Sequence, residues 1–167
     1  MPVASEVIRQ HPLLGRLTPE QVLKFAQAGE LEVFKPGEEI CVEGTPGDAL
    51  YLIISGRADV MVTPKTGVPA GSRHEGRRLA SLVPGEFFGE MSLVETAPRS
   101  ATVRAVLLTE VFRLPNFALQ NLLQDDPFAF NVVLVSIVRV LSSRLRRTNV
   151  IVSSIGMLSE WLAGSLV

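Results

Sequence analysis

The spacing of apolar and polar positions changes twice along the chain and predicts helix, then strands, then helix. Thr18-Pro19-Glu20-Gln21 is typical of a helix start, with a hydroxyl N-cap, proline at the first helical position and glutamine placed for a capping box. From Glu30 the period is two, because Leu31 and Val33 alternate with polar neighbours. The sequence therefore predicts a flanking N-terminal helix followed by strands.

Short apolar segments separated by turn residues predict a mainly β domain. The expected strands are the segments from Glu30, Glu39–Glu43, Ala49–Ile54, Ala58–Val62, Leu79–Val83, Ala101–Leu107 and Glu110–Leu114. Strands this short, with frequent glycine and proline turns, are typical of an antiparallel barrel or sandwich. Pro64–Arg78 is the most polar segment, and we expect a solvated loop there.

Helical spacing returns after the last expected strand. Pro115 is expected to open a helix to about Gln124, and Asp126 before Pro127 is an acidic N-cap for a long helix that runs to the end. Its stripe has alternating spacing of four and three, as in a coiled-coil seam. The stripe consists of Leu134, Val138, Leu141, Leu145, Thr148, Val152, Ile155, Ser159, Leu162 and Leu166. We expect packing on the chain's own barrel from Phe128 to about Leu134 and a homodimer beyond it.

Composition narrows the classes of protein. The chain has 167 residues, 47% of them hydrophobic, and a net charge of -1, which fits one folded domain and gives no overall attraction to nucleic acid. Cys41 is the single cysteine, so an internal disulfide and a thiolate zinc cluster are excluded, and we expect it to be a small buried hydrophobe. His11 and His74 lie far apart, which argues against a histidine-based metal site.

The chain shows no targeting or membrane signal. The opening MPVASEVIRQ has neither a basic nor an apolar region of a secretory signal, so a cytoplasmic location is expected. Arg139 and Glu160 interrupt the apolar runs of the last forty residues or so, and we expect no membrane span.

The segment from Phe87 to Thr102 carries the candidate chemistry. Gly89 permits close approach of the backbone, and a short helical turn after it presents amides to an anion. Arg99 supplies a planar fork for two phosphate oxygens. Glu90 has the wrong charge for phosphate but suits a sugar hydroxyl. The three features together predict a site for a phosphorylated sugar.

This segment resembles the phosphate-binding cassette of cyclic-nucleotide-binding domains. The resemblance extends to the barrel turns at Phe34–Glu38, Glu43-Gly44, Gly47-Asp48 and Tyr51–Gly56, and covers about residues 13–147. It implies an antiparallel β-roll, a double-stranded jelly-roll-like barrel with an N-terminal helix, a short cassette helix and a long C-terminal helix. Residues 1–126 would form the binding unit with the helix from 115, and residues 127–167 the lid and dimerisation helix.

The family also implies roles for individual residues. The amides of the cassette turn would contact the cyclic phosphate, Glu90 would accept from the ribose 2′-hydroxyl, and Arg99 would pair with the phosphate. Ser100 would contribute its amide and hydroxyl near the phosphate and the base, and Ala101 would pack behind it. Arg144 and Thr148 are candidate lid residues. The implied ligand-binding set is Gly89, Glu90, Met91, Ser92, Arg99, Ser100 and Ala101.

The resulting hypothesis is a regulatory module with no catalytic residues and no cofactor. Its ligand would be a cyclic nucleotide. We expect cAMP in preference to cGMP, because Arg99-Ser100-Ala101 resembles the corresponding segment of the family's bacterial transcriptional activators. It would signal through its C-terminal helix to a second copy or to a downstream protein. The 167 residues leave no room for a helix-turn-helix, so we expect no direct DNA binding.

Alternative interpretations of the same residues stay open. Glu90 and Arg99 form a structural ion pair if the pocket is vestigial, and the domain is then only a dimerisation module. A cupin-type metal enzyme is a second alternative, which needs clustered histidines. Phe87 and Phe88 are expected to be core, and the Ser92 side chain an ordinary turn residue.

Overall fold

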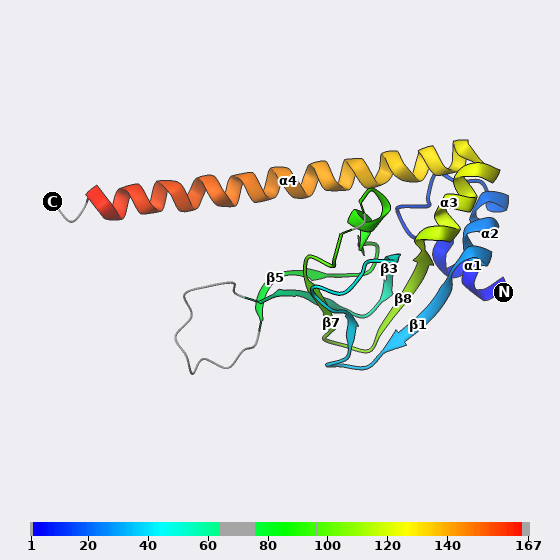
Figure 1. Ribbon diagram of the computed structural model, residues 1–167, viewed down its shortest axis with the longest axis horizontal. Coiled ribbons are helices and arrows are strands. Elements are labelled where there is room, and N and C mark those ends of the chain that lie inside the picture. The colour runs from blue at the N-terminus through cyan, green and yellow to red at the C-terminus, as the bar shows by residue number, and fades with distance from the viewer. Residues whose placement is uncertain (1, 64–75, 96, 165–167) are drawn as a thin grey trace.

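The computed structural model describes residues 2–63, 76–95 and 97–164 and contains two four-stranded antiparallel sheets with helices at one end (Figure 1). The strands are β1 (Glu30–Phe34), β2 (Glu39–Cys41), β3 (Ala49–Ser55), β4 (Ala58–Val62), β5 (Arg77–Leu82), β6 (Phe87–Phe88), β7 (Thr102–Ala105) and β8 (Thr109–Pro115). The helices are α1 (Pro2–Arg9), α2 (Pro19–Ala28), the 3-10 turn η1 (Glu90–Leu93), α3 (Asn116–Asp125) and α4 (Pro127–Gly164). The predicted mainly β fold with flanking helices is confirmed.

The strands interleave rather than follow chain order. One sheet has the order β1-β8-β3-β6 and the other β2-β7-β4-β5, so neighbouring strands come from distant parts of the chain. The last strand, β8, pairs with both β1 and β3. This pairing holds β1 and β3 in one sheet, with β8 between them.

The two faces of the first sheet pack into two separate apolar clusters. Leu50, Phe87 and Phe112 point from the first sheet toward the helices and pack with them. Ile53, Phe88 and Val111 belong to the second cluster, between the two sheets. Alternate residues of one strand thus serve two cores, which explains why β3 is apolar on both faces.

Two of the three expected helix starts, at Thr18 and Asp126, form as the sequence predicts. The Thr18 hydroxyl accepts from the Gln21 amide at 3.3 Å, and the Gln21 side chain accepts from the Thr18 amide at 3.0 Å, which completes the capping box. Asp126 accepts from the Ala129 amide at 2.9 Å and caps α4. Pro115 differs from the prediction, because it keeps extended backbone angles at the end of β8 and serves as the N-cap of α3.

Helix α4 divides into a docked half and a projecting half. Ala129, Val133 and Ile137 are buried against the core cluster, and Leu141 packs partly on it. Docking therefore extends beyond the expected limit at Leu134, and it takes in Leu141 of the predicted seam. Phe128, expected to pack, is 72% exposed because it lies on the opposite face of the helix from the buried row. The distal part of α4 extends well past the sheets (Figure 1).

One segment of the described residues, Pro127–Ile155 in α4, is long and apolar enough to cross a membrane by length and composition. Core helices of globular proteins pass the same test, so this is weak evidence. In the structure the first part of the segment is docked on the domain through Ala129, Val133 and Ile137. The expectation of no membrane span stays a prediction.

Several elements differ from the sequence prediction in their limits. Arg77 and Arg78 belong to β5 rather than to the predicted loop, and Arg78 lies 3.6 Å from Asp59 of β4. Residues 64–75 of that loop, with His74, fall outside the described residues. Cys41 is half-buried at the end of β2 rather than fully buried, and burial raises the pKa of its thiol.

Candidate functional site

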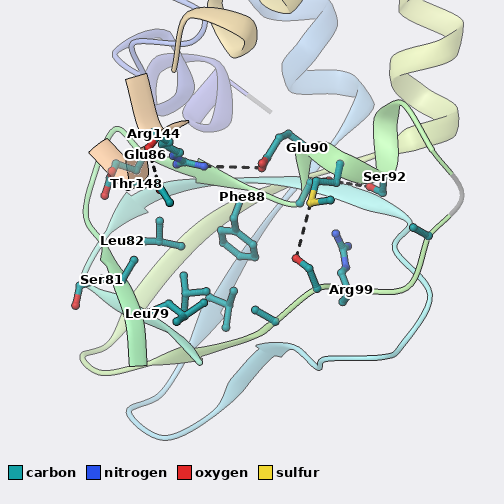
Figure 2. Close-up of a pocket in the computed structure, with 18 of the residues that line it drawn as sticks. Leu79, Ser81, Leu82, Glu86, Phe88, Glu90, Ser92, Arg99, Arg144 and Thr148 are labelled. Atoms are coloured by element: carbon teal, nitrogen blue, oxygen red, sulfur yellow. Dashed lines mark hydrogen bonds and ion pairs between the residues drawn. The ribbon is translucent and has the colours of Figure 1, made fainter. Parts of the chain in front are cut away.

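A cavity of about 470 Å³ lies between the second sheet, the cassette turn and α4 (Figure 2). Three arginines and two glutamates line it together with apolar side chains of β5 and β6. The charged lining residues are Glu86, Glu90, Arg99, Arg144 and Arg147. The cavity therefore offers an apolar wall for a ring system and a net positive edge for an anion.

The cassette turn begins at a position that only glycine fits. Gly89 has φ 83°, in the left-handed region. A Cβ there would lie 2.6 Å from the Ala49 carbonyl oxygen and 2.6 Å from Nη1 of Arg99. The lack of a side chain thus allows strand β3, the turn and the guanidinium to meet at one point.

The turn holds itself together through Ser92. Its amide donates to the Gly89 carbonyl at 3.3 Å, and its hydroxyl donates to the same oxygen at 2.8 Å. Asn116 of α3 donates to the Ser92 carbonyl at 2.9 Å. The Ser92 side chain is therefore a turn residue, and its amide is engaged inside the turn. The expected phosphate contact of that amide is not favoured by this geometry, which leaves the amides of Gly89, Glu90 and Met91 as candidates.

Arg99 is a buried cation held from one side. The residue is 8% exposed, and its Nη2 donates to the Ala49 carbonyl at 3.1 Å and lies 3.5 Å from Asp48. Its guanidinium carbon lies 5.4 Å from the centre of the Tyr51 ring. Both of these polar contacts use Nη2, and Nη1 lies beside Gly89 at the start of the cassette turn.

The Tyr51 ring beside Arg99 stacks on a second aromatic side chain, Phe88. Tyr51 and Phe88 stack with ring centres 4.9 Å apart, on neighbouring strands β3 and β6. Burial raises the pKa of the Tyr51 hydroxyl, and a hydrogen bond with Arg113 opposes that shift. Phe87 and Phe88 are both buried, as predicted, and Phe88 also forms part of the cavity wall.

Glu90 contacts α4 rather than Arg99. Its Oε2 lies 3.9 Å from Nη1 of Arg144, whose Nη2 donates to the Phe87 carbonyl at 2.7 Å (Figure 2). The Arg144 guanidinium also lies 5.0 Å from the centre of the Phe87 ring. Among the described residues, Arg99 pairs with Asp48 and Glu90 with Arg144. The structural Glu90–Arg99 pair that the sequence left open is thus not the one formed.

The remaining predicted residues surround the same cavity. The exposed Ser100 hydroxyl lies 3.8 Å from the sulfur of Met91, which is itself half-exposed. Ala101 belongs to the wall, and Thr148 faces the cavity from α4 with its hydroxyl donating to the Arg144 carbonyl at 3.1 Å. The structure therefore brings all the predicted ligand-binding and lid residues together at one site. Their roles in binding stay predictions.

Sequence reasoning missed part of this site. Part of the cavity wall is formed by residues 79–82 of β5 and by Ile151 of α4. The sequence does not mark these residues as part of a binding site, because apolar side chains in such segments are usually core. Asp48 was expected only as a turn residue, although its carboxylate lies 3.5 Å from Nη2 of Arg99. A carboxylate after glycine in a turn that precedes a buried strand was the available signal.

The cupin-type alternative requires ligating side chains that lie close together in the described part of the chain. No group of three or more histidine, cysteine, aspartate or glutamate side chains there is arranged to hold a metal ion. His11 is buried beneath the N-terminal helices, and its ring bonds to backbone atoms of Leu13 and Glu86.

Comparison with known proteins agrees with the geometry. The sequence profile of the cyclic nucleotide-binding domain matches residues 31–126, the β-roll from β1 to the end of α3. The chain belongs to this family. A cAMP-dependent protein kinase regulatory subunit of Colletotrichum orbiculare is 37% identical over 119 residues, which are 71% of this chain and 28% of that protein.

Two solved structures are similar over most of the chain. A cyclic nucleotide-binding domain of Methylobacillus flagellatus has a TM-score of 0.72 and 28% identity, and covers 86% of this chain and 77% of its own. The catabolite activator protein of Thermus thermophilus has a TM-score of 0.70 and 32% identity, and covers 87% and 63% of the two chains. The cyclic-nucleotide-binding fold is thus confirmed.

Membership in this family identifies a regulatory domain rather than an enzyme. The chain spans about 28% of the length of the curated relative it matches. The activity and partners of any longer protein are therefore a matter for proposal.

Proposed function

We propose that this domain binds a 3′,5′-cyclic nucleotide, with cAMP preferred to cGMP, in the cavity between the β-roll and α4. One observation carries the proposal: the glycine turn, the buried Arg99 and the α4 side chains Arg144 and Thr148 line a single cavity. The cavity volume of about 470 Å³ lies in the range of small-molecule sites.

The phosphate would lie between the turn and Arg99. Nη1 of Arg99 lies beside Gly89, at the start of the turn, and charge-assisted hydrogen bonds from a guanidinium favour a phosphate there. The Glu90 carboxylate, at the start of η1, would accept from the ribose 2′-hydroxyl. Arg144 would keep that carboxylate oriented.

The base would lie between the sheet and α4, near Ser100 and Thr148. The preference for adenine is supported by the relative at 37% identity, a regulatory subunit of a cAMP-dependent kinase. Ala101 would close the wall behind Ser100.

The signal would leave through α4. Beyond the docked half, its apolar side chains are exposed, among them Leu145 at 62%, Val152 at 62% and Ile155 at 59%. These three belong to the stripe with coiled-coil spacing, and we propose that a second copy covers them in a cytoplasmic homodimer. The ligand would then act through different affinities for two positions of α4, and so alter this interface or that of a downstream protein.

Titration calorimetry with cAMP, cGMP and 5′-AMP tests the proposal. We expect saturable binding of cAMP, weaker binding of cGMP, and at least about tenfold weaker binding of 5′-AMP, whose dianionic, flexible phosphate does not match a site built for a ring. If the pocket is vestigial, we expect no heat of binding with any of the three nucleotides at millimolar concentration. Equal binding of cAMP and 5′-AMP would contradict the assignment of a cyclic phosphate.

A further inference from the structure

A row of four side chains runs across the first sheet from its edge to the cavity. In the strand register Glu30 of β1 lies opposite Arg113 of β8, Arg113 opposite Tyr51 of β3, and Tyr51 opposite Phe88 of β6. Directly opposed residues share a face of the sheet, so neighbouring side chains of the row can touch. The row ends at the wall of the cavity, and the sequence alone gave no role to Arg113.

Arg113 is the centre of a charged cluster. Its Nη2 donates to Asp48 at 2.7 Å, its Nη1 donates to Glu30 at 3.2 Å, and its Nε lies 3.8 Å from Glu32. The Arg113 side chain is 22% exposed, whereas Asp48 is 65% and Glu30 63% exposed, so water reaches these ion pairs from the carboxylate side. One cation thus faces three carboxylates.

Asp48 lies between two guanidiniums and contacts them unequally. Its Oδ2 is 2.7 Å from Arg113, whereas its Oδ1 is 3.5 Å from Nη2 of Arg99. The first distance is that of a strong charge-assisted hydrogen bond, and the second is too long for one. The carboxylate nearest to the phosphate-binding arginine is therefore held mainly by a different arginine.

We propose that Arg113 is a positioning residue that keeps Asp48 from neutralising Arg99. With Arg113 present, Asp48 makes its short hydrogen bond to a residue outside the cavity lining, and Arg99 has only the longer contact at 3.5 Å, which would leave its guanidinium available to an anionic ligand. Without Arg113, Arg99 is the remaining ion-pair partner of Asp48 among the described residues, and Glu30 and Glu32 lose a counter-charge. This inference rests on the proposed binding of a cyclic phosphate at Arg99.

The test is a double-mutant cycle on cAMP affinity, measured by calorimetry. Arg113→Gln keeps much of the side-chain length but removes the charge, and we expect about tenfold weaker binding because Asp48 turns to Arg99. Adding Asp48→Asn removes the competing carboxylate, and the double variant is expected to recover most of the lost affinity. A merely structural role of Arg113 predicts the reverse, since a second substitution in the cluster would weaken the fold further.

A matched control is available in the other sheet. Arg104 of β7 pairs with Glu39 of β2 at 2.9 Å, also in direct cross-strand register, and neither lines the cavity. Arg104→Gln makes the same change in net charge, and we expect less than a twofold change in affinity. Arg113→Lys retains the cation and is expected to bind within about threefold of the wild type.

The outcomes separate this inference from the proposed function. No binding of cAMP by the wild type contradicts the proposed function itself. If the wild type binds, the inference is overturned when Arg113→Gln binds as tightly as the wild type, or when the double variant binds no better than Arg113→Gln alone. Should Arg113→Gln not fold, Asp48→Asn alone decides: affinity within threefold of the wild type supports the inference, and a larger loss overturns it.

Discussion

The cassette and the distal half of α4 differ in how far other parts of the same chain cover their side chains. Around Gly89 and Arg99, every element meets another part of the same chain: β3, β6, α3 and α4 all supply contacts. Beyond Arg144 the helix presents exposed apolar side chains such as Leu145 and Val152. The proposed binding site is thus enclosed by one chain, whereas Leu145, Val152 and Ile155, which we call the output surface, are left uncovered by it. Binding and assembly should then be separable by mutation.

The largest expected effect is on ligand affinity at the proposed binding site. Arg99→Ala removes the buried guanidinium, and loss of such a charged pair costs about 2–5 kcal/mol, or about 30-fold to over 1,000-fold in cAMP affinity. Calorimetry gives the affinity, and sedimentation velocity checks that assembly is retained. Unchanged binding of both cAMP and cGMP would remove Arg99 from the site.

The second prediction concerns the output surface of α4 and its assembly. Leu145→Glu with Val152→Glu places charges on the output surface, and we expect the dimer dissociation constant to rise at least about 100-fold, because an apolar seam cannot solvate them. Analytical ultracentrifugation measures the assembly. Cyclic-nucleotide affinity should change less than about threefold, since neither residue lines the cavity.

Substitution of the exposed Arg146 by glutamate is the control, because it alters charge beside the stripe without entering it. A wild-type chain that stays monomeric at high micromolar concentration would show that the output surface serves a different partner. Loss of ligand binding in the Leu145/Val152 variant would show that the two sides are not separable.

The third prediction concerns the contact that joins the two regions. Arg144→Ala removes the hydrogen bond to the Phe87 carbonyl and the ion pair with Glu90. We expect cAMP affinity to fall about threefold to tenfold, and any effect of cAMP on the dimer dissociation constant to disappear. The measurement is that constant with and without saturating cAMP. Arg146→Ala should preserve the ligand effect, and a ligand effect of full size in Arg144→Ala would place the coupling elsewhere.

The sequence predicted the cassette well because its chemistry is local. Gly89, Glu90 and Arg99 lie within eleven residues, and glycine, turn and arginine act through backbone conformation and charge, which residue type determines directly. The capping box at Thr18 and the limits of strands β3 and β4 follow for the same reason. Helix α1 and the two-residue strand β6 were not located, because elements this short or this near the chain end show little periodicity.

Contacts that depend on sheet register were beyond the sequence. Arg113 and Asp48 are 65 positions apart, and only the β1-β8-β3-β6 order brings them together. The extent of α4 docking was likewise misjudged at Leu134, since Ile137 is buried by a tertiary surface that periodicity does not reveal. Periodicity shows that a helix has an apolar face, and not whether the chain's own domain or another molecule covers it.

The smallest expected effect is on the pH dependence of stability. It tests whether the N-terminal region, with His11, is part of the same folded unit as the ligand-binding site. His11 is buried, with Nε2 3.2 Å from the carbonyl oxygen of Glu86, and burial lowers its pKa below the usual 6.5. As pH falls below about 6.5, the unfolded chain binds a proton that the folded chain excludes, so the free energy of unfolding decreases, by at most about 1.4 kcal/mol per pH unit. His11→Gln stays neutral and should lose this part of the pH dependence.

Thermal unfolding between pH 7.5 and 5.5 measures this effect. The decrease in Tm should be larger for the wild type than for His11→Gln, and a parallel decrease in both would assign the titration to another group. The dimer dissociation constant should change less than about twofold over the same range, because Leu145, Val152 and Ile155 carry no titratable group. Mild acid would then weaken the ligand-binding unit, which the chain completes by itself, while leaving the output surface unaffected. A dimer that dissociates in step with the protonation of His11 would instead show that the output surface forms only on an intact β-roll.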